Sequence, residues 1–242
     1  MIIIMLQYGN FFRRVLENDK KKEERFIKPF NNLKLQISRA FMASLICAIG
    51  FGLVALFISD QKIRNFDDTI IYYIQGMESP QLTKVMIFFT NIGAGLPASI
   101  IAIVTMVILY VFLGHRRELI LFISVMIGST LLNSALKLAF HRARPTIHRI
   151  IEANGYSFPS GHSMAAFSLY GVIAFLLWKH VPSLLGRVII ILVCALLILI
   201  IGISRIYLGV HYPSDVAGGY LMSGCLLGAS IWFYQRYLER KR

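Results

Sequence analysis

The sequence predicts an all-α fold, an integral membrane bundle of six transmembrane helices with a short extracytoplasmic amphipathic helical segment. The chain of 242 residues is 57% hydrophobic and only 15% charged, which is too apolar for an ordinary soluble domain. It also contains several apolar runs of nearly membrane-spanning length. The formal net charge is +13, but a nucleic-acid-binding protein would not carry such runs. We therefore expect no nucleic-acid partner and attribute the charge to membrane topology and catalysis.

The composition divides the chain into three segments. Residues 1–39 form a basic arm with nine Lys and Arg against four acidic residues, expected in the cytoplasm. It is either attracted to anionic lipid or, as we favour, a solvated tail. Residues 40–236 form the six-helix membrane domain, and residues 237–242 form a basic cytoplasmic tail. A cleaved signal peptide is not expected, because the apolar start lacks a preceding basic region and a small-residue cleavage site. The three cysteines lie inside apolar runs, which indicates small buried hydrophobic residues.

Six apolar runs are predicted to cross the membrane. The first has 20 residues, which matches the hydrocarbon thickness at about 1.5 Å per residue. The fourth and fifth are shorter than the usual minimum of about 17 residues, so their helices must extend into polar flanks or face a recessed bilayer surface. Gly218 and Gly219 indicate close helix packing in the sixth run. The runs are 40–59, 97–113, 119–136, 164–178, 188–203 and 216–234.

The segment between the first two runs, residues 60–95, is amphipathic. Asp67 and Asp68 open an amphipathic run, Pro80 interrupts it, and residues 82–89 resume an apolar face. These pieces are expected to lie along the membrane surface or to pack on the bundle.

The distribution of Lys and Arg predicts that both termini are cytoplasmic. With the N-terminus inside, 17 of the 25 Lys and Arg residues fall on the cytoplasmic side, in the arm, two loops and the tail. The others lie outside, where topology does not favour them. They need a different explanation.

Four helix ends are expected to meet at the extracytoplasmic surface, because successive spans alternate in direction. They are the end of the third span, the start of the fourth, the end of the fifth and the start of the sixth. The prominent polar clusters of the sequence lie at these ends, so folding would bring them into one pocket. The clusters are Lys137 with Arg144-Pro145, then Pro159-Ser160-Gly161-His162, then Ser204-Arg205, and then His211 with Asp215.

Three cations in these clusters suit a phosphate group. Arg144 and Arg205 have planar guanidinium groups that match phosphate oxygens, and Lys137 adds a third charge. Pro145 disfavours helix at Arg144, which lets that side chain swing off the helix end. A single cation at a helix end could instead be a snorkelling anchor, but three on the disfavoured side favour the phosphate interpretation.

Ser160 and Gly161 predict an anion site at the start of the fourth span. Serine is a good helix N-cap, and glycine lets a ligand approach the backbone closely. The backbone N–H groups and the positive helix end would then point toward the anion. A plain N-cap would also explain Ser160, but it would not explain His162 beside it.

His162 and His211 are candidates for nucleophile and proton donor, because an ordinary imidazole titrates near neutral pH. Asp215 lies four residues after His211, where it could orient the ring through its other nitrogen, as in catalytic triads. No HExxH motif or paired carboxylate cluster occurs on this side, so we expect no metal and no cofactor. The connecting loop carries further residues that either touch a head group or, as we favour, are solvated: His141, Arg142, His148, Arg149 and Glu152.

The three clusters resemble the signature motifs of the type 2 phosphatidic acid phosphatase family, which shares its core with vanadium haloperoxidases. Lys137-x6-Arg144-Pro145, Pro159-Ser160-Gly161-His162 and Ser204-Arg205-x5-His211-x3-Asp215 match without a substitution and in order. The resemblance implies a metal-independent phosphatase with a helical core and a phosphohistidine intermediate. It implies that His211 is the nucleophile, Asp215 its orienting partner and His162 the acid that protonates the leaving oxygen. The phosphate would then be bound by Lys137, Arg144, Ser160, Gly161 and Arg205.

We therefore expect a multi-pass cell-membrane lipid phosphatase with an extracytoplasmic active site, whose partners are membrane lipids and a lipid phosphate or pyrophosphate. Six spans and small size are similar to the bacterial members that act on undecaprenyl pyrophosphate or phosphatidylglycerophosphate. We place undecaprenyl pyrophosphate first, because an outward-facing site suits it, with phosphatidylglycerophosphate or phosphatidic acid as alternatives. A transporter of lipid phosphates or other anions could use the same cations, but it would need polar residues in mid-span. Spans one, two and five have almost none.

Overall fold

The structure is a computed structural model, and it describes residues 33–60, 62–112, 114–146 and 148–241, without the side chains of residues 33–38 and 112. The chain divides into two units between Arg39 and Ala40, and every feature discussed below belongs to the second, Ala40–Arg242. The expectation of a basic arm falls almost entirely outside the described residues.

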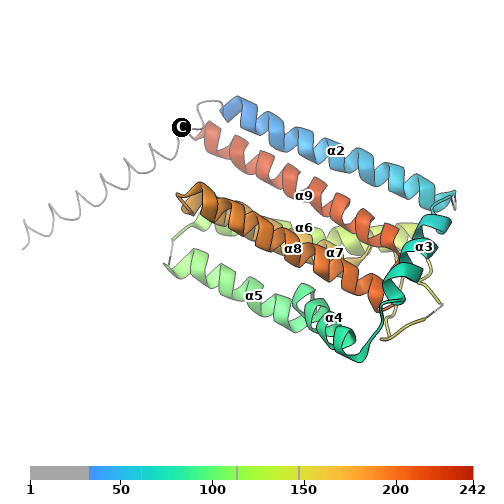
Figure 1. Cartoon of the computed structure of the whole chain (residues 1–242). Helices are drawn as coiled ribbons and strands as arrows, with labels where there is room; N and C mark the ends of the chain where they lie inside the picture. The colour runs from blue at the N-terminus through green and yellow to red at the C-terminus, as the bar shows by residue number, and fades with distance from the viewer. Residues whose placement is uncertain (1–32, 61, 113, 147, 242) are drawn as a thin grey trace, which may run out of the picture. The chain divides into compact units, whose positions relative to one another are not determined.

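Helices account for all the regular structure in the described part of the chain, which confirms the predicted fold class (Figure 1). Five helices are long and apolar enough to cross a membrane, and a bent pair of helices makes a sixth candidate span. The elements are α2 (Leu33–Ser59), α3 (Arg64–Gln75), α4 (Pro80–Gly93), α5 (Gly95–Val107), the π-helix η2 (Ile108–Phe112), α6 (Arg116–Phe140), α7 (Gly161–His180), α8 (Leu184–Tyr207) and α9 (Pro213–Arg240).

The bent pair is α4 with α5, which meet at an angle of 45°. Gly93 ends α4, Ala94 is extended, and Gly95 begins α5 with a φ of +70°. Glycine adopts this left-handed conformation at little cost, so the chain can turn sharply here. The predicted second span, 97–113, therefore covers only the second half of this candidate span, and α4 supplies the first.

The two short predicted spans become full-length helices. The fourth run lies in α7, which has 20 residues, and the fifth lies in α8, which has 24. Ser183 caps the start of α8 by accepting a hydrogen bond from the Gly186 amide at 3.1 Å. The helices thus extend into their polar flanks, which is the first of the two explanations that the sequence left open.

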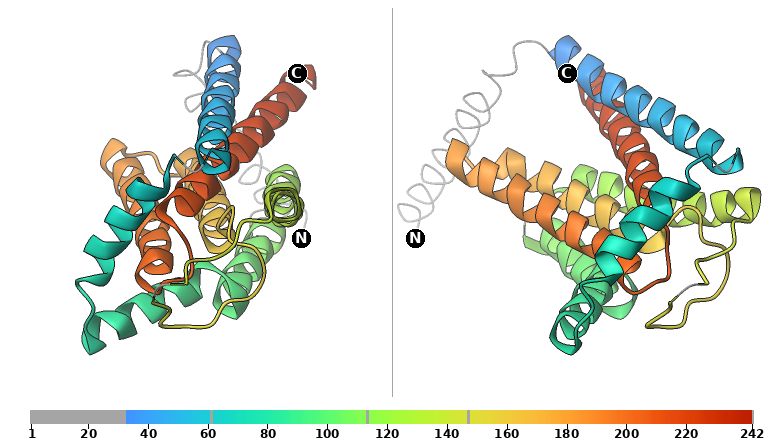
Figure 2. Two further views of the ribbon diagram at one scale, coloured as in Figure 1. Left: turned by 90° about the vertical axis from the view of Figure 1, so that its right-hand side faces the viewer. Right: turned by 45° about the vertical axis from the view of Figure 1, so that its right-hand side comes forward.

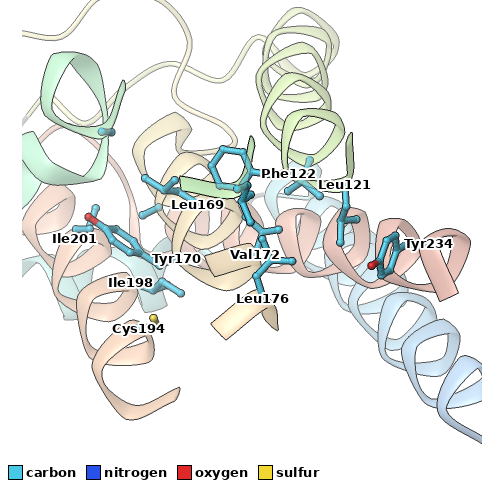
Figure 3. Close-up of a cluster of buried hydrophobic side chains, with 14 residues drawn as sticks. Leu121, Phe122, Leu169, Tyr170, Val172, Leu176, Cys194, Ile198, Ile201 and Tyr234 are labelled. Atoms are coloured by element: carbon cyan, nitrogen blue, oxygen red, sulfur yellow. The ribbon is translucent and has the colours of Figure 1, made fainter. Parts of the chain in front are cut away.

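The central helix is α7, which contacts α4, α5, α6, α8 and α9. Of the residues in its apolar window, 44% are buried, against 11–22% in the other four spanning helices. Figure 3 shows Leu169, Val172 and Leu176 of α7 between Phe122 of α6 and Ile198 of α8. Lipid tails are as apolar as these side chains, so the hydrophobic effect does not drive membrane helices together. Close van der Waals packing of this kind holds them together instead.

The amphipathic helix α3 crosses the ends of α8 and α9 and contacts both (Figure 2). Ile71 on its buried face packs against Ile206 and Val216. Tyr72 and Tyr73 on the other face are largely exposed. The helix therefore packs on the bundle, which is one of the two positions expected for it, and covers the region where the polar clusters lie.

Candidate active site

His211 lies in the turn of residues 208–212 that joins α8 to α9. The Arg205 carbonyl closes this turn by accepting hydrogen bonds from the amides of Val210, at 3.2 Å, and His211, at 3.3 Å. Gly209 has a φ of +72°, and a Cβ atom there would collide with the carbonyl group of His148. The turn buries the His211 side chain, which is only 2% exposed.

Asp215 orients this imidazole from the first turn of α9. Its Oδ2 atom lies 3.3 Å from Nδ1 of His211 and accepts a hydrogen bond from the Tyr212 amide at 2.9 Å. The hydroxyl of Ser157 donates to the same oxygen and lies 3.4 Å from Nδ1. One carboxylate thus caps a helix and faces a histidine nitrogen. In a neutral ring this arrangement places the hydrogen on Nδ1 and leaves a lone pair on Nε2.

Arg144 lies on the other side of the imidazole, with Nη1 at 3.1 Å from Nε2 of His211. Three backbone carbonyls hold the guanidinium group: Nε donates to Gly155 at 3.0 Å, Nη2 to Asn154 at 3.0 Å and Nη1 to Val210 at 2.8 Å. The side chain is buried, with 9% exposed. Since the carbonyls fix the position of the guanidinium group, a charged donor is pre-positioned beside Nε2.

Burial shapes the charge of both side chains. It lowers the pKa of His211 from 6.5 to about 4, although the hydrogen bond with Asp215 acts in the opposite direction. Burial also lowers the pKa of Arg144, and the Asp215 carboxylate partly opposes this. A guanidinium group nevertheless stays charged in proteins. At neutral pH, a neutral imidazole therefore faces a cation at Nε2.

Arg205 and Lys137 supply two further cations from the last turns of α8 and α6. Arg205 is only 4% exposed, and its Nη1 donates to Thr90 Oγ1 at 2.6 Å. Its Nε is buried and has no hydrogen-bond partner within the described part of the chain. The ammonium group of Lys137 interacts electrostatically with Arg144, Asp215 and Arg205. The three predicted cations therefore lie close enough to interact with one another.

The start of α7 completes the cluster. Ser160 is the N-cap of α7 and is fully buried. Its hydroxyl accepts two hydrogen bonds from Ser163, one from the amide at 3.4 Å and one from the hydroxyl at 2.9 Å. The Ser160 amide donates to the Asp215 carbonyl at 3.0 Å, which joins this helix start to that of α9. The amides of Gly161 and His162 precede the first amide that donates within the helix, which is that of Met164 to the Ser160 carbonyl at 3.0 Å, so they remain available to an anion. The His162 ring interacts electrostatically with His211 and with all three cations.

The structure thus brings all eight predicted site residues to one region. The sequence interpretation missed Arg142, which we expected to be solvated or at a head group. Its side chain is only 16% exposed and forms ion pairs with Asp67 and Asp215. It also missed Ser157 and Thr90, and nothing in their sequence surroundings singles them out. A signal for Asp67 did exist, because it lies four residues before Ile71 on the apolar face of α3, where a carboxylate needs a partner.

The other loop residues have separate surroundings. His148 Nε2 lies 2.9 Å from Glu78 in an exposed pair, and Arg149 donates to the Pro145 carbonyl at 2.6 Å. His141 stacks edge-on against Tyr156. Among the residues that the structure describes, no cluster of three or more His, Cys, Asp or Glu side chains could hold a metal ion.

Comparisons with known proteins find relatives in both sequence and structure. Residues 118–239 match the sequence model of the PAP2 superfamily. Phosphatidylglycerophosphatase B of Bacillus subtilis (strain 168) is 30% identical over 194 residues, which cover 79% of this chain and 94% of that protein. The putative undecaprenyl-diphosphatase YbjG of Escherichia coli (strain K12) is 34% identical over 128 residues, which cover 50% of this chain and 60% of that protein.

Two solved structures are also similar. The crystal structure of a transmembrane PAP2-type phosphatidylglycerolphosphate phosphatase from Bacillus subtilis has a TM-score of 0.67 and 31% identity, and the match covers 82% of this chain and 96% of that one. Aquifex aeolicus LpxE has a TM-score of 0.57 and 25% identity, with coverages of 69% and 94%.

Proposed function

Because this chain belongs to the PAP2 superfamily and is a membrane lipid phosphatase that works without a metal ion, we propose that it transfers its substrate's phosphoryl group first to His211 and then to water. One observation carries the proposal. His211 is a buried, neutral imidazole with Asp215 at Nδ1 and Arg144 at Nε2. This arrangement makes Nε2 a nucleophile and places a cation where a phosphoryl oxygen would bind.

In the first step, Nε2 of His211 attacks phosphorus and the bond from phosphorus to the lipid oxygen breaks. His162, whose protonated form the negative charge of the bound phosphate stabilises, gives a proton to that oxygen, so the lipid leaves as an alcohol, or as a monophosphate if the substrate is a pyrophosphate. The phosphorylated ring keeps its hydrogen at Nδ1, and the Asp215 carboxylate stabilises the positive charge that the ring acquires.

In the second step, water replaces the imidazole. A water molecule gives a proton to His162, and its oxygen attacks phosphorus while the bond to Nε2 breaks. His211 regains its lone pair and inorganic phosphate leaves. His162 thus acts first as acid and then as base, which returns the site to its starting state.

The cations and the start of α7 bind the phosphoryl oxygens in both steps. Lys137 and Arg205 approach from α6 and α8 and Arg144 from the loop after α6, while Gly161 and Ser160 hold the start of α7 beside them. The unpartnered Nε of Arg205 supports this role, because a phosphoryl oxygen would supply its missing acceptor. Such fixed charges stabilise a phosphoryl group during transfer without rearrangement.

For the substrate, we propose phosphatidylglycerophosphate first and undecaprenyl pyrophosphate second. The sequence alone placed them in the opposite order. The phosphatidylglycerophosphatase B match spans most of both chains, whereas the undecaprenyl-diphosphatase match spans half of this one. We also propose that the site faces outside the cytoplasm and that both termini lie inside, which the distribution of Lys and Arg supports.

The test is release of inorganic phosphate by the purified protein in detergent with excess chelator. We expect turnover of both lipids, with a higher kcat/KM for phosphatidylglycerophosphate, and none by a folded His211→Gln variant. A higher kcat/KM for undecaprenyl pyrophosphate would reverse the substrate order. Full activity of His211→Gln would refute the mechanism.

A further inference from the structure

Arg142 joins two buried acids from different parts of the chain. Its Nη1 donates to Asp215 Oδ1 at 2.7 Å, and its Nη2 donates to Asp67 Oδ2 at 2.8 Å. Both acids are fully buried. The guanidinium group also lies over the ring of Tyr212, with 4.2 Å from Cζ to the ring centroid. One cation, held in place by stacking, is therefore shared by two carboxylates that have left water.

Ser214 ties the same group to the start of α9. Its hydroxyl accepts a hydrogen bond from Nη1 of Arg142 at 2.7 Å and donates to Asp67 Oδ2 at 2.6 Å. Its amide donates to Asp67 Oδ1 at 2.9 Å. Both oxygens of Asp67 are thus engaged by the first turn of α9 and by Arg142. The helix α3, which carries Asp67, is attached to the residue next to Asp215.

The two oxygens of Asp215 consequently have different partners. Oδ2 receives the hydrogen bonds from Ser157 and the Tyr212 amide and faces His211, whereas Oδ1 faces Arg142. A carboxylate that is clamped at Oδ1 cannot rotate Oδ2 away from the imidazole. The charge of Arg142 also favours the ionised form of Asp215. Without this charge, Asp215 would be a buried acid close to a second buried acid, Asp67.

We propose that Arg142 and Asp67 are positioning residues, which keep Asp215 ionised and turned toward His211 and so make α3 part of the catalytic assembly. The proposal rests on the function proposed above, because the role of Asp215 is to hold the nucleophile. Neither residue touches the phosphoryl group in this scheme. Their effect on the rate passes entirely through Asp215.

The test begins with Arg142→Ala, assayed by phosphate release from phosphatidylglycerophosphate in detergent. We expect kcat to fall about 100-fold, less than the roughly 10⁴-fold loss when a triad's orienting acid is replaced, while KM changes little. Added methylguanidinium should restore part of kcat, because it can re-enter between the two acids. A purely structural role would give no such rescue.

The pH dependence gives a second readout. Removing a cation lets the His211–Asp215 pair take up a proton more readily, wherever that proton rests. The acid limb of kcat should therefore move to higher pH in Arg142→Gln. Arg142→Lys keeps the charge but loses the fork that reaches both acids, so its kcat should lie between those of the wild type and Arg142→Ala.

A matched control exists on the same helix. Arg64 and Asp68 form an exposed pair with 3.8 Å between Nε and Oδ2, one residue along from Asp67. Arg64→Gln and Asp68→Asn should keep wild-type kcat and pH profile, whereas Asp67→Asn should lower kcat. If Arg142→Ala does not fold, Asp67→Asn and Arg142→Lys still decide the matter, because wild-type kcat and pH profile in both would overturn the proposal.

The outcomes separate this inference from the proposed function. If the wild type releases phosphate and His211→Gln does not, the proposed function stands. In that case, wild-type kcat and an unchanged pH profile in Arg142→Ala would refute only the positioning role. A loss of activity that methylguanidinium does not rescue, and that comes with no shift of the acid limb, would also refute it. If the wild type releases no phosphate from either lipid, the proposed function itself fails.

Discussion

The two ring nitrogens of His211 have different surroundings, and this difference governs the chemistry of the residue. Nδ1 faces the Asp215 carboxylate, while Nε2 faces the Arg144 guanidinium group. Protonation at Nε2 would put two cations side by side in a buried site. The surroundings therefore favour a neutral ring whose lone pair points to the phosphate-binding side.

The same burial predicts a pH dependence of stability. The pKa of His211 is lowered in the folded protein from 6.5 to about 4, so the unfolded chain binds more protons between these two values. Folding is thus destabilised by this group as pH falls from 6.5 toward 4. We expect the Tm in detergent to fall with pH in this window, and to fall less steeply in His211→Gln. An equal or steeper slope in the variant would contradict the lowered pKa.

At this scale, motif spacing predicted which side chains gather but not how they are held. His211, Asp215 and the three cations are recognisable because each has a charge or a titratable ring next to an apolar run. The supports of Arg144 are mainly backbone carbonyls, and those of Asp215 include Ser157 and a residue more than 70 positions away, Arg142. Such partners become visible only once the chain is folded.

At the scale of helices, the site depends on how closely α9 approaches the segment before α7. A Cβ atom at Gly218 would collide with the ring of Phe158, and one at Gly219 would lie 3.0 Å from the Ser160 carbonyl oxygen. The sequence predicted close packing at these glycines. It did not predict that the partner of Gly218 is the loop that leads into the phosphate-binding helix start.

This contact gives a prediction about Gly218→Ala. The added methyl group must displace Phe158 and the residues that follow it, so we expect a loss of about 1–3 kcal/mol in stability and a lower kcat. Gly52→Ala in α2 is the matched control, because a Cβ atom there meets nothing within 4 Å. Alanine should be neutral or stabilise that helix by about 0.5–1 kcal/mol. Equal Tm and kcat in the two variants would show that the contact at Gly218 affects neither stability nor activity.

Helix positions followed well from the sequence because apolar runs of this length have few alternatives in a membrane protein. The break at Ala94 was not predicted. Hydropathy averages over a bend, and only the pair Gly93 and Gly95 marks the place where the backbone turns. The inward position of Asp67 was also missed, although its place four residues before Ile71 was a signal for it, because charge at the start of an amphipathic helix is usually solvated.

For the whole molecule, the distribution of positive charge predicts the orientation in the membrane. We expect Glu152→Cys, in the exposed loop beside the active site, to react with an impermeant maleimide in intact cells. Ser183→Cys, exposed between α7 and α8 at the opposite ends of these helices, should react only after the cells are opened. The parent chain is the control for its own cysteines. The reverse pattern would place the site in the cytoplasm.

Substrate choice is also a property of the whole molecule, and the sequence motifs do not determine it. In the proposed mechanism, Lys137, Arg144 and Arg205 bind a phosphoryl group, which is common to glycerolipid and isoprenoid substrates. A lipid tail would contact apolar side chains and lipid, which no motif marks. This is why the motifs leave the choice between the two substrates open.

The most direct test of the account is to trap the phosphorylated enzyme. His162→Ala should accumulate phosphate on His211 when it is given p-nitrophenyl phosphate, because this leaving group needs no proton whereas the attacking water still needs a base. After an alkaline quench, mass spectrometry should find an acid-labile phosphate on the peptide that contains His211, and none in the double variant with His211→Gln. Phosphate on another residue, or turnover by the double variant at the rate of His162→Ala, would contradict the account.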